Sequence, residues 1–164
     1  MPKYVVRHGV MRNLGVFYTR GNDAYTRGQQ VIARTHRGLE AGEVLCEATD
    51  EAVRQLVEPK QGQILRRVSD DDLRELRKMF EQERREYEIC QQRIGELNLE
   101  MQLADIEHLY GGERVVVYYL AEDLLAERGL LALSGGLYGR GHVGLEPGGR
   151  LDAEPPYLCR NILC

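Results

Sequence analysis

The sequence predicts an α+β protein, with a small N-terminal curled β-sheet or barrel followed by a long helix packed on a β-hairpin. Three observations support this prediction. Short β-type runs fill the first 57 residues, one amphipathic helical pattern follows Ser69, and two strand-like segments meet at Gly111-Gly112.

The composition is that of a globular protein. Hydrophobic residues make up 43% of the 164 residues and charged residues 29%, which excludes a chain too polar to fold. The formal net charge of −4 argues against a surface devoted to nucleic acid but permits a local basic patch. We expect a cytoplasmic protein, because the start lacks a signal-peptide run and no stretch reaches the roughly 18 apolar residues of a membrane span.

Four or five short strands are expected in the first zone. The runs Tyr4–Val10 and Leu14–Thr19 are separated by Met-Arg-Asn, which is a hairpin signal. Two further runs cover residues 28–38 and 39–49, and glycines stand where turns or bulges would lie. This many short strands in about 50 residues favours a small curled sheet or a partly open barrel.

A helix of about 25 residues is expected after Ser69. Ser69 is a favourable N-cap, and Asp72 follows three residues later, as in a capping box. The apolar residues then recur at helical spacing, with one slot taken by Glu83. They are Leu73, Leu76, Phe80, Tyr87, Cys90, Ile94 and Leu97. The other faces are rich in Arg and Glu, so we interpret them as solvated, with a partner-binding stripe as the alternative.

Two strands are expected after the helix. The segment 99–110 alternates in polarity, whereas Arg114–Ala121 is continuously apolar, which is typical of a central strand covered on both faces. Asp105 and Glu107 share one face of the first strand, where we interpret them as solvent-side acids rather than a catalytic pair. We expect no enzymatic activity and no catalytic residue, because the chain has no nucleophile elbow, phosphate loop or HExxH motif.

The composition changes after residue 122. The 16 residues from Ser134 to Gly149 include seven glycines, and prolines follow. Such a segment has few residues that can fill a core. The sequence therefore predicts three parts: a β-rich domain at 1–57, a helix-plus-hairpin part at 58–122, and an atypical Gly/Pro-rich segment at 123–164.

Cys159 and Cys164 are the candidate metal ligands. Their two thiolates would supply half of the four ligands of an iron–sulfur cluster or a structural zinc site. Three alternatives stay open: two free thiols, a site shared with a partner, or a site completed within the chain, with His142 as one further ligand. Cys46 and Cys90 lie inside regular patterns, where we interpret each as a small buried hydrophobe.

The N-terminal zone is locally basic. Positions 1–47 contain seven Lys and Arg residues but only four Asp and Glu residues, and Tyr and Phe residues are interspersed among them. A small β-barrel of this kind can bind a single strand by stacking and phosphate contacts, although the aromatic residues also fit core positions. The candidate nucleic-acid contacts are Arg7, Arg12, Arg34 and Arg37.

Two segments also carry the pattern of a known family. GQQVIARTHRGLEAGEV is similar to G-D-x-V-I-V-x-T-x-R-G-x-E-x-G-x-V, and the segment around Cys90 leads into a match to L-x-M-x-L-x-D-x-E. The first match comprises Gly28, Val31, Thr35, Arg37, Gly38, Glu40, Gly42 and Val44, and the second Leu99, Met101, Leu103, Asp105, Glu107, Tyr118 and Ala121. Over residues 4–122 the chain thus resembles the PSP1 C-terminal-domain family, bacterial regulatory proteins of the YaaT type.

The resemblance ends after residue 122. The family continues with a run such as R-V-D-F-R-E-L-V, which this sequence lacks, so the chain resembles a divergent or truncated member or one with a shifted reading frame. The resemblance then implies an incomplete α/β sandwich whose strand Arg114–Ala121 is partly uncovered. The family's C-terminal cysteine pattern, G-x-C-G-x-x-x-C-C, has its first two cysteines spaced as Cys159 and Cys164 are.

The resemblance implies a function as well. It implies a non-enzymatic regulatory or adaptor subunit of a cytoplasmic bacterial complex that affects RNA maturation by endoribonuclease Y and developmental signalling. The implied partners are small cytoplasmic proteins, the endoribonuclease and RNA, with an iron–sulfur cluster shared with a partner. The rival function, which rests on the basic β-zone, is a stand-alone single-stranded nucleic-acid-binding module.

Overall fold

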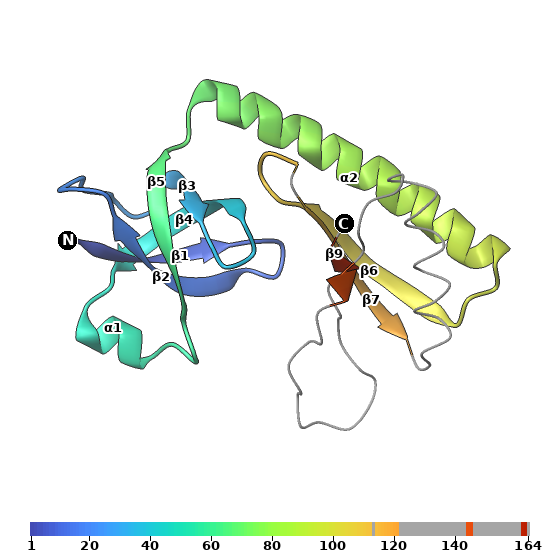
Figure 1. Ribbon diagram of the computed structural model, residues 1–164, viewed down its shortest axis with the longest axis horizontal. Helices are drawn as coiled ribbons and strands as arrows, with labels where there is room; N and C mark the ends of the chain where they lie inside the picture. The colour runs from blue at the N-terminus through green and yellow to red at the C-terminus, as the bar shows by residue number, and fades with distance from the viewer. Residues whose placement is uncertain (113, 122–143, 146–161, 164) are drawn as a thin grey trace. The chain divides into compact units, whose positions relative to one another are not determined.

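The computed structural model describes residues 1–112, 114–121, 144–145 and 162–163. It divides into two compact units, drawn with their elements in Figure 1. Unit 1 comprises Met1–Leu76 with Leu109–Gly111, and unit 2 comprises Arg77–His108 with Gly112–Cys164. A β-barrel, a long helix and a β-hairpin make up the described parts, so the predicted α+β class is confirmed. Among the described residues, no helix has the length and apolar character needed to span a membrane.

Unit 1 contains a closed barrel with the strand order β1-β2-β5-β3-β4. Its strands are β1 (Lys3–His8), β2 (Asn13–Thr19), β3 (Gln30–Arg34), β4 (Leu39–Glu47) and β5 (Lys60–Arg67). β5 pairs in parallel with β2 and antiparallel with β3, while β4 returns to pair with β1. Because the barrel is closed, each of these five strands has a partner on both sides.

The barrel core is formed by the inward-facing side chains of all five strands. Phe17 on β2 is its largest fully buried side chain and is 1% exposed. Two glycines make room for this ring: a Cβ atom on Gly62 would lie 2.4 Å from the Phe17 ring, and one on Gly15 would lie 2.6 Å from it. The other members of the core cluster are Tyr4, Val6, Tyr25, Val31, Ala33, Val44 and Ile64.

The structure places the last strand of the barrel beyond the boundary expected at residue 57. The chain leaves β4 through the short helix α1 (Asp50–Arg54), whose N-cap Thr49 accepts a hydrogen bond from the backbone N–H of Ala52. It then enters β5, which fills the gap between β2 and β3. The barrel therefore includes residues that the sequence prediction assigned to the helix-plus-hairpin part.

The long helix α2 (Asp70–Glu96) begins where the capping signal predicts. The Ser69 N–H donates to Asp72 Oδ2 over 2.8 Å, and the Asp72 N–H donates to Ser69 Oγ over 3.3 Å, which completes the capping box. The predicted apolar stripe was wrong at Phe80 and Leu97, which are 61% and 52% exposed. Glu83, the charged residue that interrupts the apolar spacing, is half-buried.

Helix α2 packs on the hairpin of β6 (Met101–His108) and β7 (Val115–Ala121) within unit 2. The sheet order is β6-β7-β9-β8, with β8 at Gly144–Leu145 and β9 at Ile162–Leu163. The core cluster joins Cys90 to strand residues on one face of the hairpin: Leu103, Ile106, Val115, Val117 and Tyr119. The side chains from Val115 to Tyr119 are all buried, which confirms a covered central strand and shows that the expected partial exposure of this strand was wrong.

We predict that Gly62→Ala destabilises the protein by about 1–3 kcal/mol, because the added methyl group meets both the Phe17 ring and the backbone oxygen of Arg34. Gly95→Ala is the matched control, since nothing lies within 4 Å of its added methyl group. Alanine at that helical position should be neutral or stabilising by up to about 1 kcal/mol. Urea unfolding followed by circular dichroism measures both, and equal effects at the two positions would contradict the packing argument.

Candidate functional site

The turn between β3 and β4 is built by the Thr-x-Arg-Gly-x-Glu segment. Gly38 has φ 147°, a backbone conformation that favours glycine, and its carbonyl accepts a hydrogen bond from the Thr35 N–H over 2.8 Å. The Thr35 hydroxyl oxygen accepts the Arg37 N–H over 3.0 Å, and the hydroxyl donates to Glu40 Oε1 over 2.5 Å. The turn thereby directs the side chains of Arg37 and Glu40 toward each other.

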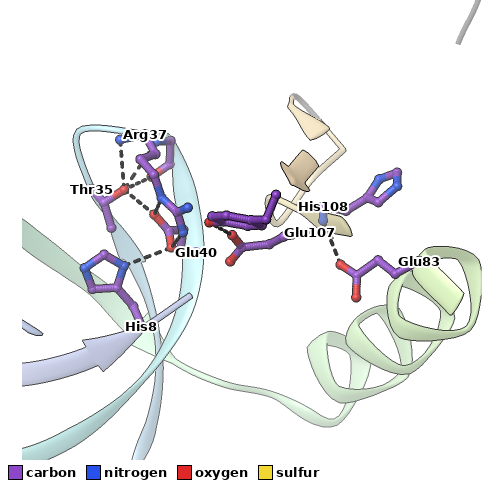
Figure 2. A network of polar contacts seen from close by, with 9 residues as sticks. His8, Thr35, Arg37, Glu40, Glu83, Glu107 and His108 are labelled. Carbon is purple, nitrogen blue, oxygen red and sulfur yellow. Dashed lines mark hydrogen bonds and ion pairs between the residues drawn. The ribbon is translucent and has the colours of Figure 1, made fainter. Parts of the chain in front are cut away.

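Glu40 is the centre of a buried ionic network in unit 1, shown in Figure 2. Arg37 donates to both carboxylate oxygens, from Nε over 3.0 Å and from Nη2 over 2.6 Å. His8 Nδ1 lies 2.9 Å from Glu40 Oε2, and its ring packs edge-on against Phe17 with centroids 5.5 Å apart. Burial disfavours the charged carboxylate, but the hydrogen bonds from His8 and Arg37 outweigh it and lower the pKa of Glu40 to about 2.

A second carboxylate of unit 1, Asp72, joins β5, the start of α2 and the turn that carries Tyr110. It accepts hydrogen bonds from Arg66 on β5, from Ser69 at the N-cap of α2 and from the Tyr110 hydroxyl. The Arg66 guanidinium is the main cause that holds the pKa of Asp72 well below its usual range. Asp72 is thus a structural acceptor that fixes the start of α2.

Unit 2 has its own polar network between α2 and β6. The backbone N–H of His108 donates to Glu83 Oε1 over 2.7 Å, and His108 Nε2 lies 2.5 Å from Glu86 Oε2. Burial raises the pKa of Glu83, an effect that the hydrogen bond from the His108 N–H partly offsets. These side chains were not predicted as a group, and the only sequence signal is the i, i+3 spacing of Glu83 and Glu86 on the buried side of the helix.

Glu107 is a further buried carboxylate, and its burial was not predicted from the sequence. It is 8% exposed and accepts a hydrogen bond from the Tyr118 hydroxyl over 2.7 Å. The interpretation of Glu107 as a solvent-side acid was therefore wrong. A bulge between Leu103 and Asp105 shifts the β6–β7 register, and the Asp105 side chain accepts the N–H of Ile106.

The described cysteines do not fit an iron–sulfur or zinc site. Cys90 is buried in the apolar core of unit 2, as expected, and burial raises the pKa of its thiol to about 11. Cys46 is exposed on β4, and its interpretation as a buried hydrophobe was wrong. No group of three or more His, Cys, Asp or Glu side chains in the described part could hold a metal ion. The predicted ligands Cys159 and Cys164 lie outside the described residues, as does His142.

The four candidate nucleic-acid contacts fall into two kinds. Arg37 is 8% exposed and bound to Glu40, and Arg7 forms an ion pair with Glu43 over 2.5 Å. Arg12, in the β1–β2 turn, and Arg34, at the end of β3, are exposed. The structure therefore does not present the four arginines as one set of cations that could contact phosphate.

We predict that Glu40→Gln destabilises the protein by about 1–3 kcal/mol, because a neutral amide replaces the buried carboxylate that accepts two hydrogen bonds from Arg37. Glu43→Gln is the matched control, since the Arg7–Glu43 pair is more than one-third exposed and should contribute less than about 1 kcal/mol.

The same pair of variants tests a pH dependence. The pKa of Glu40 is about 2 in the folded protein against an ordinary value of 4.5, so its stabilising contribution is complete above pH 4.5 and is lost as the pH falls toward 2. As the pH falls from 4.5 toward 2, the melting temperature of the Glu43→Gln protein should fall. The melting temperature of the Glu40→Gln protein should fall by less over the same range. Parallel pH profiles would contradict the assignment.

Comparison with known proteins gives one match. Residues 62–131 match the model of the family described as PSP1 C-terminal conserved region. This range includes most of β5 and all of α2, β6 and β7. No curated protein and no solved structure matches the chain.

Proposed function

Because this chain belongs to the PSP1 domain family through residues 62–131, we propose that it is a non-enzymatic adaptor subunit of a cytoplasmic bacterial complex that affects RNA maturation and developmental signalling. Membership in this family suggests a regulatory domain, and the match is the observation that carries the proposal. The partners we propose are other small cytoplasmic proteins and an endoribonuclease.

The surface of α2 supports an adaptor role. The helix buries one narrow side against the hairpin, through Cys90 with Tyr87 and Ile94. Its remaining surface is rich in Arg and Glu, and it exposes two large apolar side chains, Phe80 at 61% and Ile89 at 43%. Apolar side chains set among charges are the usual composition of a surface that binds another protein reversibly.

The arginines of the barrel favour the adaptor over the rival nucleic-acid module. A module that binds a single strand needs several cations along the path of the backbone. Two of the four candidate arginines are bound to glutamates, which leaves Arg12 and Arg34 as the exposed pair. We therefore expect RNA to be contacted mainly through partner proteins.

Affinity purification of the tagged chain from its own bacterium tests this proposal. We expect small proteins to co-purify in fixed ratio and to be lost when Phe80→Glu and Ile89→Glu are combined. They should be retained in the control Lys78→Ala with Arg85→Ala, which removes two exposed charges from α2 and changes the net charge by the same amount. The purified chain should bind RNA weakly and with little dependence on salt. Tight RNA binding that falls steeply as salt rises, with no partner retained, would favour the module and overturn the adaptor.

We also propose that Cys159 and Cys164 contribute two ligands to an iron–sulfur cluster shared with a partner. The observation behind this proposal is their spacing in the sequence. Anaerobic purification of the complex, followed by a visible spectrum and iron and zinc analysis, should give a brown protein. Cys159→Ser with Cys164→Ser should abolish the colour and the bound iron, while the exposed-thiol control Cys46→Ser should keep both. A colourless, metal-free complex refutes the cluster.

A further inference from the structure

A groove of about 510 Å³ lies on unit 1 between α1 and strands β1, β2 and β5. It adjoins Lys3, at the start of β1, and so lies at the opposite end of this strand from the His8–Glu40 network. Its volume falls in the range of about 300–1,000 Å³ that is typical of ligand sites.

The walls of the groove include several apolar side chains. Val16 lies on β2, Val53 lies on α1, and Pro59 immediately precedes β5. Aliphatic walls of this kind favour an apolar side chain over a hydrated or charged group, because burying the apolar surface releases water. The space is large enough for one large apolar side chain with its neighbouring backbone.

Tyr18 forms a wall that is held in place from two sides. Its hydroxyl donates to Gln61 Oε1 over 2.9 Å, and Lys3 Nζ lies over the ring, 5.2 Å from the ring centroid. The cation covers one face of the ring, and the ring is only partly exposed. This arrangement disfavours the stacking of a nucleobase on Tyr18, which needs an open aromatic face.

The groove is flanked by two cations and one carboxylate, all of them exposed: Lys3, Arg54 and Asp50. The guanidinium of Arg54 donates to the backbone oxygen of Asp50 over 3.1 Å, which holds it against the helix. The net charge of +1 complements carboxylates on a ligand. Asp50 can accept N–H groups, which a peptide backbone has and a phosphodiester backbone lacks.

We propose that this groove binds an extended segment of a partner protein in which a large apolar residue is flanked by acidic residues. The apolar side chain enters between Val16, Val53 and Pro59, while its acidic neighbours pair with Lys3 and Arg54. This inference rests on the proposed adaptor function, because it names the kind of segment through which a partner would be recognised.

Amide chemical shifts of the isotope-labelled full chain, titrated with the synthetic peptide EDLFDE blocked at both ends, test the proposal. We expect saturable shifts clustered on the residues that line the groove, and no such shifts with the control peptide EDAADE. Lys3→Glu combined with Arg54→Glu should weaken binding about tenfold or more, since two favourable pairs become repulsive. The matched control is Arg12→Glu with Arg34→Glu, which makes the same change of charge elsewhere on the barrel and should leave binding unchanged.

Two outcomes overturn the proposal. One is that the peptide causes no saturable shifts, or causes them outside the groove, or binds both double variants with equally reduced affinity. The other is a uridylate decamer that shifts the groove residues and displaces the peptide, which would assign the groove to nucleic acid. Unchanged amide shifts away from the substitutions verify that each variant is folded. The titration uses the isolated chain and a synthetic peptide, so its failure leaves the co-purification test of the adaptor function unaffected.

Discussion

The burial of the Glu40 carboxylate is the constraint on which the organisation of the barrel depends. An ionised carboxylate away from water costs several kcal/mol unless hydrogen-bond donors surround it. Arg37, His8 and Thr35 supply those donors, and they come from the β3–β4 turn and from β1. Satisfying one buried charge therefore fixes the turn and connects it to β1, and His8 extends the connection to Phe17 in the core. The Thr-x-Arg-Gly-x-Glu pattern is explained by this role in the fold.

Elements with strong local signals could be predicted from the sequence. The capping residues Ser69 and Asp72 marked the start of α2, and Gly111-Gly112 marked the turn of the hairpin. β5 was missed because Lys60–Arg67 is polar at both ends and has no clear alternation. Its identity as a strand depends on pairing with β2 and β3, which are distant in the sequence.

The polar networks could not be predicted for a related reason. His108 lies 22 residues from Glu86, and His8 lies 32 residues from Glu40, so only the folded chain brings each pair together. A buried Arg37 and an exposed Arg34 also look alike in a sequence, because a charge indicates a solvated position unless its partner is known. On α2, the half-buried Glu83 took the place that the periodicity assigned to apolar residues.

The position of β5 has a consequence for how the protein is made. A nascent chain that has emerged only as far as α1 has the two hairpins of the barrel but lacks the strand that belongs between β2 and β3. The facing edges of those two strands then expose backbone N–H and C=O groups, which can pair with other chains until β5 arrives. The family match begins at residue 62, within β5. The barrel can therefore close only after the ribosome has begun to synthesise the region that matches the family. Completion of the barrel is thus coupled to synthesis of that region.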